Sequence, residues 1–230
     1  MTKTFAVDAD IIAYRSASVT QDKDELIEIL DNTLGNISSV TSVKHMRLYL
    51  SGENNFRHDA AKTKPYKGNR KQEKPLLLRK AKQYLQLEYG AIVVDGYEAD
   101  DAIASDMKQN GAIHCGIDKD ILQVAGTHYN FVKEAYVEVS EEQAKYNLYH
   151  QLITGDSTDN IGGLPNYGEV KANEMLQGNP DPELACKMAY MEVIGDDWHD
   201  YYQEQYALVK LVDDLNMLDL ITKEFKGRLF

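Results

Sequence analysis

Three short apolar runs in this chain each lead into acidic residues. Thr4–Val7, Ala91–Val94 and Ala112–Ile117 have the composition of buried strands, and carboxylates follow each run closely. Helical spacing of apolar residues separates them, for example over residues 22–39. In a chain that alternates strands and helices, the ends of parallel strands meet at one edge of a sheet, where ligands bind. The pattern predicts an α/β fold, with a mostly parallel, twisted sheet flanked by helices and carboxylates gathered at one edge.

The later part of the chain is organised differently. The remaining expected elements are strands at 46–50, 128–132 and 136–139, and helices at 11–17, 76–89, 99–108, 140–154, 169–177, 181–194 and 199–215. Ser140-Glu-Glu-Gln143 resembles a capping box that begins the helix at 140–154. From Glu53 to Lys74 apolar periodicity gives way to charge, which predicts an exposed, mobile segment. We therefore expect an α/β domain over residues 1–150 and a helical region over residues 151–230.

Composition narrows the class of protein. The 230 residues are 43% hydrophobic and 27% charged, which suits one large globular domain with an appendage. No apolar stretch approaches the roughly 20 residues of a membrane span, and the start lacks the apolar region of a signal peptide. Two distant cysteines without metal-ligand spacing are expected to be reduced thiols. We expect a cytoplasmic protein, a monomer by default, with no membrane partner.

Motifs for several other chemistries are missing from the sequence. The six histidines form no H-x-x-x-H or H-E-x-x-H arrangement, which disfavours zinc hydrolysis. There is no G-x-S-x-G turn and no G-x-x-x-x-G-K-[ST] phosphate loop. Acyl transfer and NTP hydrolysis therefore lack support, and no nucleotide cofactor is expected.

Carboxylates form four clusters along the chain: Asp8 with Asp10, Glu98 with Asp100 and Asp101, Asp118 with Asp120, and Asp156 with Asp159. Brought together, each pair at about 4 Å repels by roughly 4 kcal/mol at an effective dielectric of 20. Oxygen ligands favour Mg²⁺ or Mn²⁺, and two such ions about 3.5–4 Å apart clamp a phosphodiester for in-line hydrolysis. The clusters predict a two-metal nuclease. Each cluster alone also allows a plainer interpretation, in which the acids cap helices or lie in turns.

Basic residues are concentrated in one stretch although the net charge is −12. Between Lys62 and Lys82 nine Lys and Arg residues stand against one acid, which suits a protein that grips phosphates at one place. There, Lys67 and Arg70 would hold a phosphate and Tyr66 would stack on an unpaired base. The alternative is an ordinary solvated surface.

Residues 155–168 are rich in glycine and precede a helix that carries Lys171. Gly162, Gly163 and Gly168 allow close approach to the backbone, so N–H groups there would cradle phosphates. The alternative is an ordinary loop between two helices.

The chain resembles the 5′-to-3′ exonuclease and flap endonuclease superfamily over about residues 4–176, because these motifs occur in the same order as in that superfamily. It is most similar to the compact bacteriophage members, and also to the 5′-nuclease domain of bacterial DNA polymerase I. Tyr66-Lys-Gly-Asn-Arg70 resembles the family's arch, and Glu98-Ala-Asp-Asp101 its central acidic motif. The resemblance implies a PIN-like (resolvase-like) sheet, a helical arch at about 53–82 and a duplex-binding helix–three-turn–helix at about 151–177.

The resemblance also implies roles for individual residues. The metal ligands would be Asp8, Glu98, Asp100, Asp101, Asp118, Asp120, Asp156 and Asp159, the catalytic residues Lys67, Arg70 and Asp118, and the DNA contacts Tyr66, Lys67, Arg70, Lys71, Gly162, Gly163, Gly168 and Lys171. The expected reaction is Mg²⁺-dependent hydrolysis of duplex DNA from a 5′ end, a nick or a 5′ flap, leaving 5′-phosphates in phage-type DNA replication. Two or more Mg²⁺ ions, replaceable by Mn²⁺, would bind, with K⁺ at the helix–three-turn–helix. A PIN-type single-stranded ribonuclease and a catalytically impaired DNA-binding protein stay open as alternatives.

Three positions depart from the family pattern. Many relatives carry an aspartate directly after the second strand, where this chain has Leu50-Ser-Gly-Glu53. Either Glu53 replaces that carboxylate or one carboxylate is missing. Asn166-Tyr-Gly168 keeps one glycine of the usual G-x-G, and Asp10 stands where the pattern demands no acid.

Overall fold

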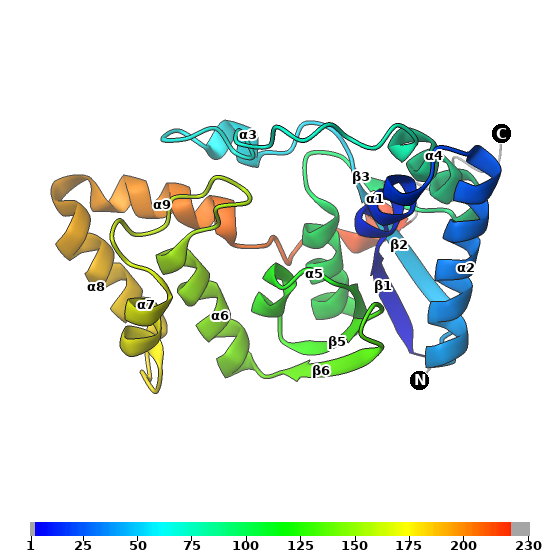
Figure 1. The fold of residues 1–230 in the computed structure, drawn as a ribbon. Helices are drawn as coiled ribbons and strands as arrows, with labels where there is room; N and C mark the ends of the chain where they lie inside the picture. Colours follow the sequence, from blue (N-terminus) through cyan, green and yellow to red (C-terminus); the bar gives the residue numbers. More distant parts are fainter. Residues whose placement is uncertain (1–2, 222–230) are drawn as a thin grey trace.

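The computed structural model describes residues 3–221 and centres on one six-stranded sheet (Figure 1). The strands are β1 (Thr4–Asp8), β2 (His45–Ser51), β3 (Ile92–Val94), β4 (Ile113–Gly116), β5 (Gly126–Asn130) and β6 (Ala135–Val139). Their order in the sheet is β3-β2-β1-β4-β5-β6, and every neighbouring pair is parallel except β5 with β6. The chain reverses its direction across the sheet at β1, the position where ligands bind in such folds. The mostly parallel α/β sheet was predicted and is confirmed.

Helices cover both faces of this sheet. Helices α1 (Ala9–Val19), α2 (Lys23–Thr41) and α4 (Leu78–Tyr89) pack on one face, and α5 (Ala99–Asn110) packs on the other. Successive side chains of a strand point to opposite faces. Phe5 and Val7 therefore join the core under α1, α2 and α4, while Ala6 joins the core under α5. Within the described residues, no helix is long and apolar enough to cross a membrane.

A second apolar core lies beside the sheet (Figure 1). It is built by α6 (Glu141–Thr154), α7 (Glu169–Leu176), α8 (Pro182–Ile194) and α9 (Trp198–Val209). Ser140 begins α6 as its N-cap and accepts a hydrogen bond from the Gln143 amide at 3.1 Å, as its capping sequence predicted. The domain boundary predicted at residue 150 falls inside α6, and residues 222–230 of the predicted helical region lie outside the described residues.

The last predicted helix, 199–215, is too long, because α9 ends at Val209. The chain then leaves the helix and returns to the sheet. There the Leu211 amide donates to Gln123 Oε1 at 2.9 Å, and the Val212 amide donates to Asp101 Oδ1 at 2.8 Å. Buried side-chain acceptors thus take the N–H groups that another helical turn would have used.

Residues 52–77, between β2 and α4, form what we call the basic segment. It runs from the sheet towards α9, turns there and returns to α4 (Figure 1). Its only helix in the structure is α3 (Arg57–Ala60), so the predicted helical arch is largely wrong; Pro65 and Pro75 disfavour longer helices here. The prediction of a freely exposed segment is also wrong at two residues, because Arg57 and Tyr66 are only 1% and 4% exposed.

Two buried histidines lie on neighbouring strands, His114 on β4 and His128 on β5. Their Nδ1 atoms are 3.1 Å apart, and His128 Nε2 is 2.9 Å from the Val124 carbonyl oxygen. Because that carbonyl only accepts, we assign the proton of His128 to Nε2 and the shared Nδ1 proton to His114. His114 Nε2 then has no hydrogen-bond partner. Burial, with a smaller contribution from His128, lowers the pKa of His114 to about 3.

We expect this pair to make the fold sensitive to acid. His114 stays neutral in the folded chain but binds a proton near pH 6.5 once unfolded, so the free energy of unfolding falls below that pH, by up to about 1.4 kcal/mol per unit. In urea unfolding, the free energy of unfolding of His114→Leu should fall less steeply with pH between pH 6 and pH 4 than that of the parent. His45→Leu, at an exposed histidine, should keep the parent slope. Identical slopes for all three proteins would contradict this account.

Candidate active site at the edge of the sheet

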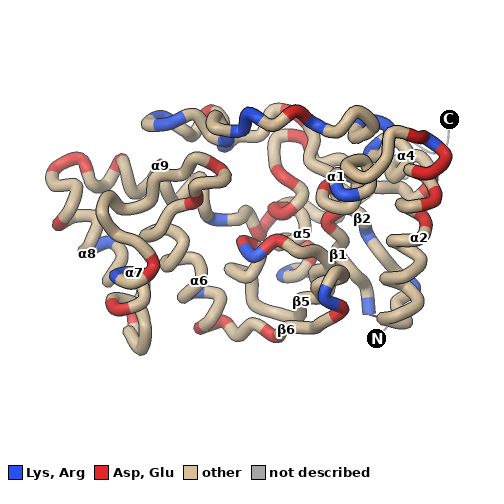
Figure 2. The backbone as a smooth tube through the Cα atoms, in the orientation of Figure 1, with Lys and Arg blue, Asp and Glu red and all other residues tan. Residues whose placement is uncertain are grey.

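A cleft of about 170 Å³ lies between the sheet and the helical part. Its acidic wall consists of Glu98, Asp100, Asp118, Asp120, Asp156 and Asp159. The basic segment contributes Arg57, Tyr66, Lys67 and Arg70 to the opposite wall. Figure 2 shows acidic residues gathered at the centre of the molecule, with basic residues along the segment that passes over them. Folding therefore brings together carboxylates from three separate clusters of the sequence.

Strand ends and helix starts place these carboxylates. Asp8 is not among the residues that line the cleft, but it interacts electrostatically with Asp100, which does. Asp8 ends β1 and caps α1, with its Oδ1 accepting from the Ile11 amide at 3.1 Å. Glu98 is the N-cap of α5, where the positive end of the helix dipole favours a carboxylate. Asp118 follows β4, and its Oδ1 accepts from the Asp120 amide at 2.9 Å.

The carboxylates destabilise one another's charged forms. Burial, and then repulsion by Asp10 and Asp118, raises the pKa of Asp8 to about 7. Burial also raises the pKa of Asp100 well above its usual value, with Asp8 and Asp118 as the next causes. Burial followed by Asp118 and Asp156 raises the pKa of Asp120 to about 7. Positive charge in this cleft would be bound strongly at neutral pH, because it relieves this repulsion.

The basic segment supplies cations to the cleft. Lys67 Nζ pairs with Glu98 and lies 3.5 Å from Asp159 Oδ2, and Arg70 also pairs with Asp159. The Lys67 backbone has a positive φ of 55°, which is uncommon for a lysine. Its amide donates to the Asp159 carbonyl oxygen at 2.8 Å, so residues 155–168, which we call the glycine-rich turn, hold this residue in place.

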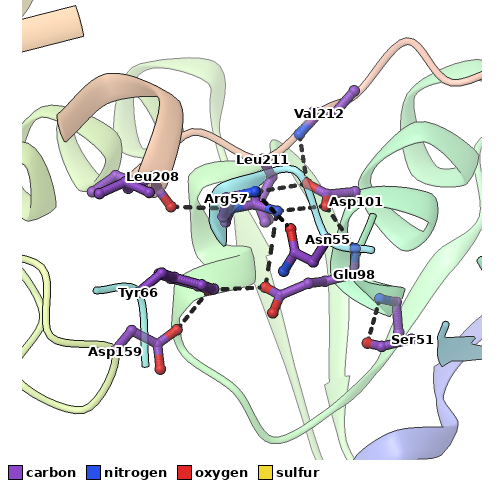
Figure 3. A network of polar contacts seen from close by, with 12 residues as sticks. Ser51, Asn55, Arg57, Tyr66, Glu98, Asp101, Asp159, Leu208, Leu211 and Val212 are labelled. Atoms are coloured by element: carbon purple, nitrogen blue, oxygen red, sulfur yellow. Dashed lines mark hydrogen bonds and ion pairs between the residues drawn. The ribbon is translucent and has the colours of Figure 1, made fainter. Parts of the chain in front are cut away.

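Tyr66 does not have the role that was predicted for it. Its ring packs in the helical core, and its hydroxyl lies 3.1 Å from Glu98 Oε2 and 2.9 Å from Asp159 Oδ2 (Figure 3). The prediction that Tyr66 stacks on an unpaired base is therefore wrong, because the ring is buried. The hydroxyl instead links two carboxylates that lie on different parts of the fold.

Asp101 is also placed differently from its neighbour Asp100. Its oxygens form a two-pronged ion pair with Arg57 at 2.7 and 2.8 Å, and both side chains are buried (Figure 3). The amides of Glu98 and Val212 donate to the same carboxylate at 3.0 and 2.8 Å. The prediction that Asp101 binds a metal ion is therefore corrected, since both of its oxygens are already engaged within the protein.

Arg57 was missed from the sequence. It lies in a charged stretch without periodicity, and nothing local distinguishes it from its exposed neighbours. Besides Asp101, its guanidinium donates to the carbonyl oxygens of Leu208 and Lys210 at 3.1 and 3.2 Å. One buried side chain thus joins the basic segment, helix α5 and the chain that leaves α9.

The glycine-rich turn exposes only some of the predicted phosphate contacts. Gly163 is buried, and its amide donates to Gln205 Oε1 at 3.0 Å, so the prediction that Gly163 contacts DNA is wrong. Gly162, Gly168 and Lys171 are exposed. Lys71, in the basic segment, is exposed as well.

The structure shows which carboxylate lies after the second strand, where the sequence departs from the family pattern. Glu53 is exposed and is not among the residues that line the cleft. Asp10 lies at that place instead, with its Oδ2 accepting from the Ser51 amide at 2.9 Å and its Oδ1 2.5 Å from Lys82 Nζ. A carboxylate from α1 therefore lies at the end of β2.

The cleft fits a hard divalent cation by its donor chemistry. Carboxylate oxygens are the ligands that Mg²⁺ and Mn²⁺ prefer, and Asp100 Oδ1 is buried without a hydrogen-bond partner. Among the residues that the structure describes, no group of three or more His, Cys, Asp or Glu side chains is arranged to hold a metal ion by itself. Mg²⁺ does not require one, because it usually keeps several waters and binds through one or two carboxylates.

The adjacent residues Asp100 and Asp101 should respond to substitution in opposite ways. Asp100→Asn is expected to stabilise the metal-free protein, because it removes one of several repelling carboxylates. Asp101→Asn should destabilise it by about 3 kcal/mol, because it breaks a buried ion pair with Arg57. Urea unfolding in chelator at pH 8 measures both effects. Changes of the same sign in the two variants would contradict these assignments.

Comparison with known proteins gives partial sequence matches. No protein-family profile matches the chain. It is 29% identical over 127 residues to DNA polymerase I of Rhizobium leguminosarum, and 30% identical over 150 residues to that of Bacillus caldotenax. These matches cover 49% and 55% of this chain but only 12% and 17% of the polymerases. The chain therefore corresponds to less than a fifth of the length of these relatives.

Similarity to solved structures extends over nearly the whole chain. The flap endonuclease of bacteriophage T5, in complex with DNA and metal ions, matches with a TM-score of 0.75 and 16% identity over 99% of this chain and 98% of the other. The catalytic core of Rad2 with DNA substrate matches with a TM-score of 0.53 and 18% identity over 99% of this chain and 88% of the other. The resemblance found in the sequence is thus confirmed, and the chain has the fold of the T5 5′-exonuclease and flap endonuclease.

Proposed function

We propose that this protein is a divalent-metal-dependent 5′-to-3′ exonuclease of DNA that also cuts 5′ flaps. The observation that carries the proposal is the cleft, which six carboxylates line together with Lys67 and Arg70. Its partial similarity to DNA polymerase I and its fold give further support. The expected substrate is duplex DNA with a 5′ end, a nick or a 5′ flap.

The acidic residues in and beside the cleft divide between two metal ions. Asp8, Glu98, Asp100 and Asp118 would organise one Mg²⁺, and Asp120, Asp156 and Asp159 a second, largely through waters, with Mn²⁺ as a substitute. When bound, such ions supply a nucleophile at neutral pH and neutralise charge on the phosphate. Lys67 and Arg70 would exchange their carboxylate partners for the phosphate, draw it into the cleft and stabilise the charge that develops during cleavage.

The glycine-rich turn and the basic segment would hold the duplex. Gly162, Gly168, Lys171 and Lys71 are exposed and would contact backbone phosphates, which position DNA without reading its sequence. We include K⁺ as a ligand of the turn at residues 155–168 in this proposal, on the resemblance alone.

Asp118→Asn tests the metal chemistry. We expect Mg²⁺-dependent cleavage of a 5′-labelled duplex to fall by about 100-fold or more, because the variant removes a metal-facing charge. The stabilisation by Mg²⁺ in thermal unfolding should shrink in parallel. Asp59→Asn, an exposed aspartate of the basic segment, should behave like the parent. Normal folding of Asp118→Asn with undiminished cleavage would refute the proposal.

The same assay separates the two alternatives. The parent protein is incubated with nicked duplex, 5′-flap DNA and single-stranded RNA, with Mg²⁺ or with chelator. Cleavage of RNA alone would favour the ribonuclease. Tight binding of flap DNA without any cleavage would favour the impaired DNA-binding protein.

Lys67→Ala tests the role of the basic segment. Its loss should slow single-turnover cleavage by roughly 100-fold, because it acts on the charge of the transition state. Affinity for the duplex should change far less. Lys71→Ala, an exposed neighbour, should weaken binding slightly and leave the cleavage step unchanged. Equal losses of rate and affinity in Lys67→Ala would show that it only anchors DNA.

A further inference from the structure

Two consecutive polar residues of α9, Glu204 and Gln205, are buried, with 6% and 1% exposure. Buried polar side chains cost free energy unless they are hydrogen-bonded. Both are bonded here, but to two segments that are about 100 positions apart in the sequence. Neither residue belongs to the cleft itself.

Glu204 holds the basic segment. Its Oε1 accepts from the amides of Lys62 and Thr63 at 2.7 Å each, and from the Thr63 hydroxyl at 2.9 Å. Hydrogen bonds to a charged acceptor are about twice as strong as neutral ones. The carboxylate therefore fixes the backbone a few residues before Lys67.

The chain between Thr63 and Lys67 has little freedom. The Pro65 carbonyl oxygen accepts from the Gly68 amide at 3.0 Å and from Asn160 Nδ2 at 2.9 Å. Because these hydrogen bonds close the turn, the position of Thr63 at one end helps to determine that of Lys67 at the other. The place of Lys67 in the cleft thus depends on where Glu204 holds Thr63 as well as on the hydrogen bond from its own amide to Asp159.

Gln205 and Tyr201 hold the glycine-rich turn. The Gly163 amide donates to Gln205 Oε1 at 3.0 Å, and the Tyr201 hydroxyl donates to the Gly163 carbonyl oxygen at 2.8 Å. Gly163 has a φ of +62°, and a Cβ there would lie 2.4 Å from the Gly155 amide nitrogen. The exposed Gly162 is next to this fixed residue, and a Cβ built on it would lie 3.6 Å from Lys64 Nζ.

We propose that Tyr201, Glu204 and Gln205 are positioning residues that determine which phosphodiester is cut. They hold the basic segment and the glycine-rich turn within about one turn of the same helix. Together with the direct hydrogen bonds from the Lys67 amide to Asp159 and from Asn160 to Pro65, they therefore set the distance from Lys67 to Gly162. This distance fixes how far the reacting phosphate lies from the gripped duplex. The inference rests on the proposed nuclease function and deepens it.

The test compares Glu204→Ala and Tyr201→Phe with the parent on a 5′-flap DNA labelled at the 3′ end, in Mg²⁺ under single-turnover conditions. The parent should cut one phosphodiester. Both variants should spread their cuts over neighbouring phosphodiesters, with the rate at the parent position lower by roughly 10- to 100-fold and duplex affinity within about two-fold. Glu204→Gln keeps an acceptor oxygen and should restore the parent cut. Gln203→Ala, exposed on the same helix, is the matched control.

Tyr201→Phe removes one hydroxyl from a half-buried ring, so it carries the test if Glu204→Ala does not fold. Hydrogen exchange without DNA or metal gives a second readout: the Lys62 and Thr63 amides should exchange faster in a folded Glu204→Ala. Variants that cut the parent phosphodiester as sharply as the parent would overturn the positioning role, even if they were slower. A parent that cuts none of the DNA substrates would overturn the proposed nuclease function itself.

Discussion

Repulsion among the carboxylates in and beside the cleft is the constraint around which this structure is arranged. Asp8 and Asp100 are withdrawn from water and lie near further acids, so their ionised forms are disfavoured in the protein alone. The fold places this repulsion where β1, β4 and the start of α5 meet, at the reversal point of the sheet. A protein built only for stability would not gather carboxylates there, which is why the cleft itself indicates function.

The cations of the basic segment pair with the carboxylates in two different ways. Lys67 and Arg70 reach the acidic wall with partly exposed side chains. A phosphate can therefore replace the carboxylates as their partners, and a metal ion can replace Lys67 and Arg70 beside those carboxylates. Arg57, by contrast, is buried and bound to Asp101, and the pair is structural. Two adjacent aspartates, Asp100 and Asp101, thus have different tasks, because only one of them faces a buried arginine.

Contacts from the helical part of the chain hold the walls of the cleft in place. Helix α9 holds the basic segment through Glu204 and the glycine-rich turn through Gln205. The chain that leaves α9 then runs back along α5 and bonds to Asp101 through Val212. These contacts fasten the sheet and the helical core to each other on both sides of the cleft.

The sequence by itself determined those features of the fold and of the site that depend on local residue patterns. Strand and helix periodicity, the cap at Ser140 and acids after strands predicted the sheet and the edge at which Asp8 and Asp118 lie. Local pattern could not reveal that Arg57 pairs with Asp101, 44 positions away, or that α9 stops early because Val212 bonds to the same residue, 111 positions away. Burial of Tyr66 and Gly163 was likewise decided only by packing against the helical core. The physical reason is that a buried charge or amide requires a partner, and the partner is chosen by the folded chain rather than by neighbours in sequence.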